Sequence, residues 1–209
     1  PIGGAGVIEV FIRWLRIEGP REAPKVNGRL RGLVQADAVA FLGDVVDAVE
    51  QNGYACRTSF DGRCMWLQQE YQVMLATEDY LSVRNTLRRL MPGAVGDASE
   101  IRAETFDLST GRPIAIGDLF DPATDWVPAL SAAAIERLGN EPWTDDRRFT
   151  GAGPQAANFT RFNLTAGGLV LSFPPLTVGG SGTNTLSVTV PYRTLDGYWA
   201  PDGPVPMIG

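Results

Sequence analysis

Residues 105–120 read TFDLSTGRPIAIGDLF, and they predict a strand, a glycine turn and the start of a helix in immediate succession. Phe106 and Leu108 alternate with polar neighbours, which is the period of a strand with one buried face. Gly111 supplies the positive φ that a chain reversal requires. Asp107 is placed to accept hydrogen bonds from this turn, so a structural role accounts for it. The stretch therefore indicates a fold and points to no catalyst.

Apolar periodicity predicts the other elements. Residues 34–49 carry apolar side chains three and four positions apart, as one face of an amphipathic helix does, and Asn52-Gly53 ends that helix. Residues 65–76 and 80–90 predict an antiparallel pair of strands joined by a short turn. We also expect strands at 7–17, 101–108, 169–173 and 186–190, a loop holding residues 25–28, a helix capped by Asp125 and ended near Gly139, and a loosely held tail from residue 201.

These elements together predict the fold class. Strands and helices follow one another without regular alternation, so we expect an α+β fold with a mainly antiparallel sheet and helices packed on one side. The chain has 209 residues, which is enough for a hydrophobic core that needs no metal ion to fold.

The composition excludes several classes of function. The chain contains no histidine, which removes the commonest general base, the Ser-His-Asp and Cys-His arrangements, and the usual zinc and haem ligands. We expect no catalytic residues of those kinds, no metal site and no cofactor. The 18 Lys and Arg residues are scattered and the net charge is −6, which argues against a nucleic-acid partner. No apolar run approaches the ~20 residues that a membrane-spanning helix needs.

The two cysteines bracket a turn. Cys56 and Cys64 lie on either side of Asp61-Gly62, a dipeptide typical of tight reversals. A disulfide across this hairpin is our prediction, and it would suit an oxidising compartment. Two buried free thiols are the alternative.

Acidic and aromatic residues supply the candidate sites. Asp118, Asp121 and Asp125 form an acidic cluster, but carboxylates at the start of helices are expected from capping and the helix dipole, so we read them as structural. The candidates for binding are aromatic, because such side chains stack on sugar rings and anchor protein partners. They are Trp143, Tyr192, Tyr198 and Trp199, and a role in the core or as a lid is the alternative for each.

Three stretches carry a resemblance to a known family. Residues 105–120, residues 158–175 (NFTRFNLTAGGLVLSFPP) and residues 188–192 (VTVPY) resemble the signature of a family of extracytoplasmic bacterial domains without an assigned activity. The family includes the outer part of the anti-sigma factor RsiV, the non-catalytic N-terminal part of the peptidoglycan deacetylase PdaC, and a secreted immunogenic antigen of mycobacteria. The resemblance covers roughly residues 100–199.

The resemblance implies a location and a role. It implies a secreted, periplasmic or cell-surface chain whose portions 1–92 and 93–209 dock as one compact unit. It also implies a non-catalytic module that binds a lysozyme-like protein or a cell-wall glycan. Two alternatives stay open: an enzyme that acts on cell-wall polysaccharide through carboxylates, and a secreted antigen-like structural protein. We read the start at Pro1 as consistent with removal of an upstream signal peptide or anchor.

Overall fold

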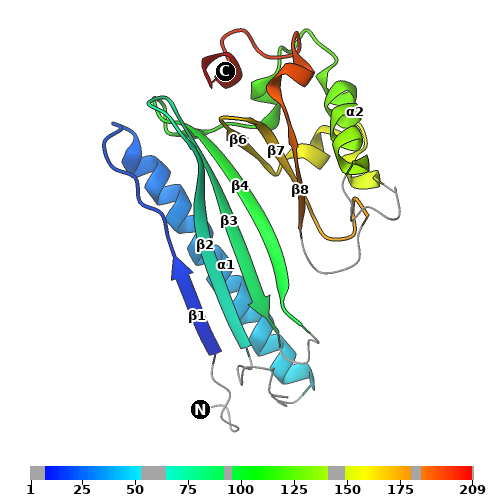
Figure 1. Cartoon of the computed structure of the whole chain (residues 1–209). Helices are drawn as coiled ribbons and strands as arrows, with labels where there is room; N and C mark the ends of the chain where they lie inside the picture. Colours follow the sequence, from blue (N-terminus) through cyan, green and yellow to red (C-terminus); the bar gives the residue numbers. More distant parts are fainter. Residues whose placement is uncertain (1–7, 53–64, 92–95, 141–148, 180–184, 209) are drawn as a thin grey trace.

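A long helix covers one face of a five-stranded sheet, and a three-stranded sheet with its own helix lies against the other face (Figure 1). The structure is a computed structural model that describes residues 8–52, 65–91, 96–140, 149–179 and 185–208. Cys56, Cys64 and Trp143 lie outside the described residues, so the disulfide stays a prediction.

The first sheet has the order β1-β2-β3-β4-β5. Its strands are β1 (Ile8–Arg13), β2 (Met65–Ala76), β3 (Tyr80–Leu90), β4 (Ala98–Asp107) and β5 (Arg112–Pro113). Neighbours are antiparallel except β1 and β2, which run parallel. A parallel pair needs a long crossover, and α1 (Ala23–Asn52) provides it. The predicted pair at 65–76 and 80–90 is confirmed residue for residue.

Helix α1 begins earlier than the sequence pattern predicts. Residues 25–28 were expected in a loop, yet the helix begins at Ala23. Pro24 is tolerated there because the first turn of a helix needs no intrahelical N–H. Val26 and Leu30 are buried against the first sheet. Polar contacts also hold Asn27 in place, because its side chain makes two hydrogen bonds of 2.9 Å with the backbone of Ile17. Tertiary contacts thus outweigh the weak local propensity.

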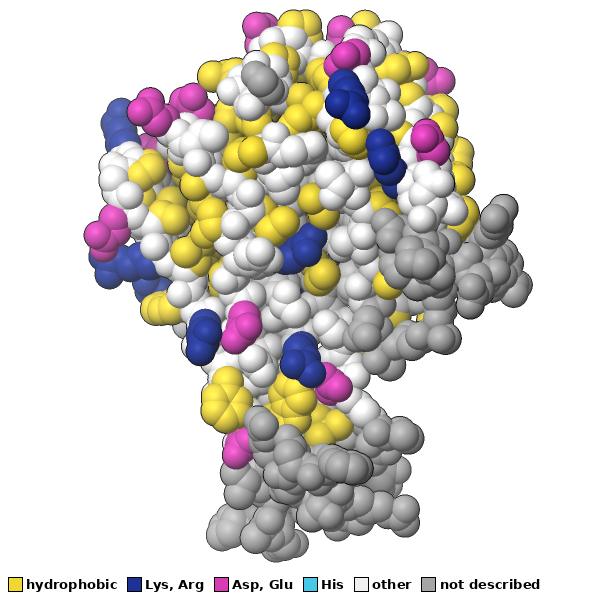
Figure 2. All heavy atoms as spheres, in the orientation of Figure 1, with side chains coloured by type: hydrophobic (Ala, Val, Ile, Leu, Met, Phe, Trp, Pro, Cys, Tyr) yellow, Lys and Arg dark blue, Asp and Glu magenta, His cyan; other side chains and the backbone are white. Residues whose placement is uncertain are grey.

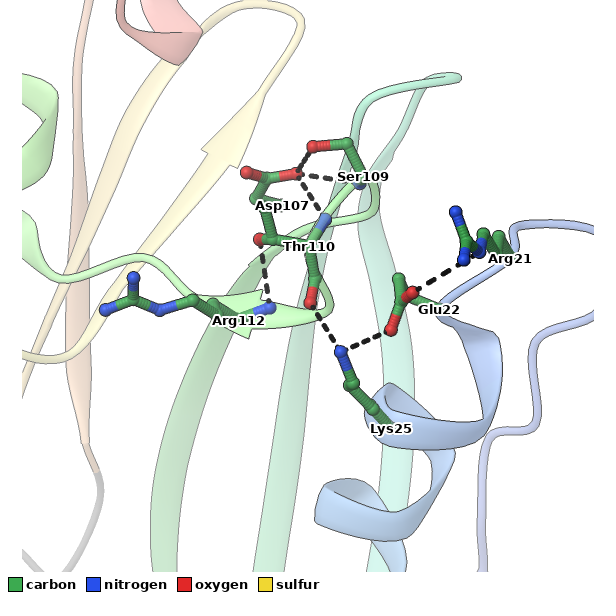
Figure 3. Close-up of polar contacts among 7 residues, drawn as sticks. All are labelled: Arg21, Glu22, Lys25, Asp107, Ser109, Thr110 and Arg112. Carbon is green, nitrogen blue, oxygen red and sulfur yellow. Dashed lines mark hydrogen bonds and ion pairs between the residues drawn. The ribbon is translucent and has the colours of Figure 1, made fainter.

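The turn predicted at residues 109–111 is confirmed, and it fastens the sheet to α1 (Figure 3). Asp107 accepts hydrogen bonds from the backbone N–H groups of Ser109 and Thr110 at 2.7 and 3.2 Å. Partial burial opposes the charged form of Asp107, but these hydrogen bonds outweigh it and lower its pKa. Gly111 has a φ of 69°. Lys25 of α1 donates to the Thr110 carbonyl at 3.5 Å, so the turn rests on the helix.

The second sheet has the order β6-β7-β8. It comprises β6 (Phe162–Thr165), β7 (Gly168–Phe173) and β8 (Leu186–Val190), and α2 (Trp126–Gly139) packs on it. Short helices complete this part: η1 (Ile116–Leu119), η2 (Thr150–Ala152), η3 (Ala156–Phe159), η4 (Tyr192–Leu195) and α3 (Pro204–Ile208). Every residue of β7 is buried, which makes this strand the centre of the second core.

Two expectations for this part are wrong. Asp125 precedes α2, but its side chain makes no capping hydrogen bond, because its backbone (φ −88°, ψ 64°) departs from the extended conformation of an N-cap. The tail is not loosely held, since α3 is helical and Val205 is buried in the second core. The burial of apolar side chains stabilises this end of the chain, which the sequence pattern did not predict.

Hydroxyl and amide groups join the two sheets. Asn163 of β6 donates to the Ser82 hydroxyl at 3.1 Å and to the Val83 carbonyl at 2.8 Å. The backbone N–H of Leu164 also donates to Ser82, at 3.0 Å, and the Ser82 hydroxyl lies 2.9 Å from that of Thr105. The boundary expected near residue 92 falls between β3 and β4, which are paired neighbours in the first sheet.

The architecture confirms the α+β class with a mainly antiparallel arrangement. Within the described ranges, no helix combines the length and apolarity needed to cross a membrane.

Candidate binding site

The aromatic candidates Tyr192 and Trp199 are partly buried and pack against the second core. The Tyr192 hydroxyl donates to the Thr165 carbonyl at 2.8 Å, and burial raises the pKa of Tyr192 to about 12. The indole Nε1 of Trp199 donates to the Tyr192 carbonyl at 3.0 Å, and the two rings meet edge to face at 5.8 Å. Both polar groups are therefore satisfied inside the protein.

A stack of three rings continues from Trp199. Phe120 lies between Trp126 and Trp199, with ring centroids 4.5 and 4.7 Å away. Tyr198 is partly buried against the same core, and its carbonyl accepts from the Asp121 N–H at 2.8 Å. This geometry gives the three aromatic candidates near the chain end a structural role. Ligand contact by Tyr192, Tyr198 and Trp199 stays a prediction.

Two of the three residues of the acidic cluster serve local structure. A carboxylate oxygen of Asp118 accepts from the Ala115 N–H at 2.8 Å, and one of Asp121 accepts from the Ala123 N–H at 2.8 Å. Across the part of the chain that the structure describes, no three His, Cys, Asp or Glu side chains gather closely enough to hold a metal ion.

A different feature has the form of a binding site. A hollow of about 430 Å³ opens between the beginning of β4 and the loop after β7. We call it the inter-sheet hollow. Its lining combines apolar, cationic and anionic side chains, which is typical of sites that fix the orientation of a ligand. The lining residues are Leu87, Arg89, Ala98, Ser99, Glu100, Arg161, Pro174, Pro175, Leu176 and Thr185.

The charged wall of the hollow is held by a chain of ion pairs. Glu100 lies 3.5 Å from Arg161 and 3.7 Å from Arg102. Arg102 in turn pairs with Asp37 of α1. Burial raises the pKa of Asp37 although Arg102 and a hydrogen bond from Gln69 oppose that rise. These ion pairs hold the carboxylate of Glu100 and the guanidinium of Arg161 at the wall of the hollow.

The apolar lip of the hollow is a turn closed by hydrogen bonds. The Thr177 N–H donates to the Pro174 carbonyl at 3.3 Å, and the Thr177 hydroxyl donates to the same atom at 2.8 Å. Leu176 has a φ of 65°, a conformation that normally requires glycine. Its side chain is nevertheless 73% exposed. The turn therefore holds a large apolar side chain in water at a cost in conformational energy.

One border of the hollow is an open strand edge. Beyond β4, the described residues supply one strand, β5, and it pairs only with Phe106 and Asp107. The Ser99 carbonyl faces this side, where it accepts from the Thr185 hydroxyl at 3.4 Å. The Thr105 carbonyl faces the same side and accepts from the Ile114 N–H at 2.7 Å. Because carbonyls alternate along a strand, Ile101 and Ala103 present theirs to this edge as well.

The inter-sheet hollow corresponds to no continuous pattern in the sequence. Its lining comes from β3, β4 and the loop after β7, which are far apart in the chain. One local signal existed: a bulky Leu176 directly after Pro174-Pro175. On the face that Figure 2 shows, Lys and Arg side chains are mixed with Asp and Glu.

Comparison with solved structures shows which known fold this one resembles. A DUF3298 family protein from Bacteroides fragilis aligns with a TM-score of 0.55 at 16% sequence identity, over 92% of this chain and 73% of that chain. The two proteins share a fold. A DUF3298 family protein from Pseudomonas aeruginosa gives a TM-score of 0.46 at 14% identity, over 66% of this chain and 62% of that chain. The sequence matches no family model and no curated protein. The likeness to the Bacteroides protein therefore describes architecture and assigns no activity.

Proposed function

We propose that this chain is a non-catalytic, extracytoplasmic domain that binds an extended segment of a partner protein in the inter-sheet hollow. The observation that carries this proposal is that the β4 edge, open among the described residues, and the exposed Leu176 border the same hollow. Extended peptides bind by adding a strand to an open edge, where main-chain hydrogen bonds supply affinity and nearby pockets supply specificity. The resemblance to the family of RsiV and PdaC supports the extracytoplasmic location.

A protein ligand suits the hollow better than a glycan. Sugar recognition uses exposed aromatic faces, and the described lining of the hollow has none. The stack around Phe120 engages ring faces of Trp126 and Trp199 within the protein. Arg161 and Glu100 would instead meet charged groups on a peptide.

The enzyme alternative finds less support at this site. Hydrolysis of a polysaccharide by carboxylates needs two acids that flank the scissile bond. Among the described residues that line the hollow, Glu100 is the single carboxylate, and it pairs with two arginines.

Leu176→Gly gives a sharp test, because glycine adopts a positive φ freely. The variant should fold at least as stably as the parent, yet bind a protein ligand about tenfold more weakly, since an exposed anchor is lost. Calorimetric titration with lysozyme measures the affinity, and thermal unfolding measures the stability. Met207→Ala removes another exposed side chain (61%), which is absent from the lining of the hollow, and serves as the control.

Three outcomes would contradict the proposal. Equal affinity of lysozyme for Leu176→Gly and for the parent would show that the hollow is not part of the binding surface. Saturable heat with soluble peptidoglycan fragments and none with lysozyme would favour the glycan alternative. Release of reducing ends or acetate from peptidoglycan would establish an enzyme.

A further inference from the structure

In the part of the chain that the structure describes, the outer edge of β1 is open and apolar. Among the described residues β1 has a single neighbouring strand, β2. Five large apolar side chains along and just after β1 are 39–55% exposed. They are Ile8, Val10, Phe11, Ile12 and Trp14. Open, hydrophobic edges readily pair with another chain, and proteins usually protect them.

Helix α1 extends this apolar surface on one side of the sheet. Val39, Leu42 and Val46 are 42–70% exposed. They continue the helical stripe of Arg31, whose guanidinium lies 5.1 Å above the Trp14 ring just beyond β1. The opposite side of α1 leans toward β3 and β4, where Asp44 pairs with Arg89 at 3.1 Å. The exposed stripe therefore lies on the side of β1.

We infer that β1 pairs antiparallel with β1 of a second copy of this chain, about a twofold axis at Phe11. The two first sheets then form one continuous sheet across the interface. The apolar surface described above would be covered by its own counterpart. This inference concerns the β1 edge and is independent of the inter-sheet hollow at β4.

Strand geometry restricts the possible registers. Alternate residues of β1 direct their N–H and C=O groups away from β2. In an antiparallel pair, two opposed residues both point toward the partner or both point away. Opposed residues of two identical strands must then be both odd or both even in number. Most residues of β1 are paired only in the registers whose twofold axis lies at Val10, Phe11 or Ile12.

Charge selects the register with its axis at Phe11. There, Glu9 of each copy lies opposite Arg13 of the other, on the same face as Phe11. Arg13 also lies 3.7 Å from Glu70 of its own chain, so its exposed guanidinium would be shared between Glu70 and the second copy's Glu9. On the other face, Ile8 lies opposite Trp14 and Val10 opposite Ile12, so the apolar surfaces merge. An axis at Val10 would set Glu9 against Phe11, and an axis at Ile12 would set Arg13 against Phe11. Self-complementarity of this kind fits a second copy of the chain.

Charge reversal tests the pairing. Glu9→Arg and Arg13→Glu each place like charges opposite one another, and each should weaken dimerisation at least tenfold in sedimentation equilibrium. The double variant restores opposite charges and should recover most of the affinity. Circular dichroism checks that all variants fold. A parent chain that remains monomeric at high concentration, or a double variant as weak as the singles, overturns the inference.

A cysteine placed on the axis tests the register. Phe11→Cys should give a covalent dimer on mild oxidation, because directly opposed Cβ atoms are ~5 Å apart. Arg13→Cys is the matched control, since its two copies would lie four residues, or ~13 Å, apart along the strands. Peptide mapping by mass spectrometry separates an 11–11 link from links through Cys56 or Cys64. Equal cross-linking of both variants, or a link at residue 13 alone, would refute this register.

Discussion

At the scale of single residues, one hydroxyl group connects the layers of this protein. Ser82 is fully buried, and its oxygen lies within hydrogen-bond distance of groups on Asn163, Leu164 and Thr105. When a buried donor loses its acceptor, the folded state is destabilised by the full desolvation free energy of that donor. The contacts of Ser82 therefore matter more than its size suggests.

Ser82→Ala should lower the free energy of unfolding by about 1–3 kcal/mol, because the Leu164 N–H and the Asn163 amide lose a common acceptor. Chemical denaturation measures this change. Ser99→Ala, at the partly exposed beginning of β4, is the control and should stay within about 0.5 kcal/mol. Equal effects of the two substitutions would show that the inter-sheet hydrogen bonds carry no special weight.

At the scale of elements, the turn after β4 is built to rest on α1. Gly111 needs its positive φ to close the turn, and its lack of a side chain lets the helix approach. A Cβ at this position would lie 3.0 Å from the Cβ of Glu22 and 3.1 Å from that of Lys25. Lys25 also pairs with Glu22 at 2.5 Å, as Figure 3 shows. The same glycine thus serves the turn and its contact with the helix.

Gly111→Ala should destabilise the protein by more than the ~1–2 kcal/mol expected from the left-handed conformation alone. Gly197→Ala is the matched control, because Gly197 has a φ of 85° and open space around its Cβ position. The difference between the two unfolding free energies, from denaturant titration, measures the crowding against α1. If Gly197→Ala proved as costly as Gly111→Ala, the turn would not be pressed against the helix.

At the scale of the whole molecule, each layer holds a partly buried tyrosine. Tyr71 lies under α1, where its hydroxyl donates to the Leu30 carbonyl at 3.4 Å, and Tyr192 lies in the second core. Burial raises the pKa of each phenol to about 12. Since buried hydrogen bonds join the two sheets, weakening one layer should unfold both together.

The free energy of unfolding should therefore fall as the pH rises from about 10 to 12. The unfolded chain loses its phenol protons near pH 10, whereas the folded chain keeps those of Tyr71 and Tyr192 to about pH 12. The unfolded state then binds fewer protons, so stability decreases with pH in this window. Tyr192→Phe should make the decrease shallower in denaturant titrations at several pH values. An unchanged slope would mean that Tyr192 ionises as readily when folded.

The candidate sites show why part of the proposed site was hidden from the sequence. Tyr192 and Trp199 attracted attention as aromatic residues near the chain end, but only the structure shows their polar atoms bonded within the core. Arg161 and Glu100 looked like scattered charges until folding placed them 3.5 Å apart at one wall. Their alignment depends on long-range pairing that no local pattern encodes.

The sequence by itself determined the elements whose side chains repeat with a clear period: the strands at 65–76 and 80–90, the turn at Gly111 and the α+β class. Local sterics and alternating burial suffice for these. Only the tertiary structure decided the early start of α1 and the burial of α3. It also decided the inter-sheet hollow and the open edge of β1. Each of these depends on contacts between distant segments, whose packing energy overrides local preference.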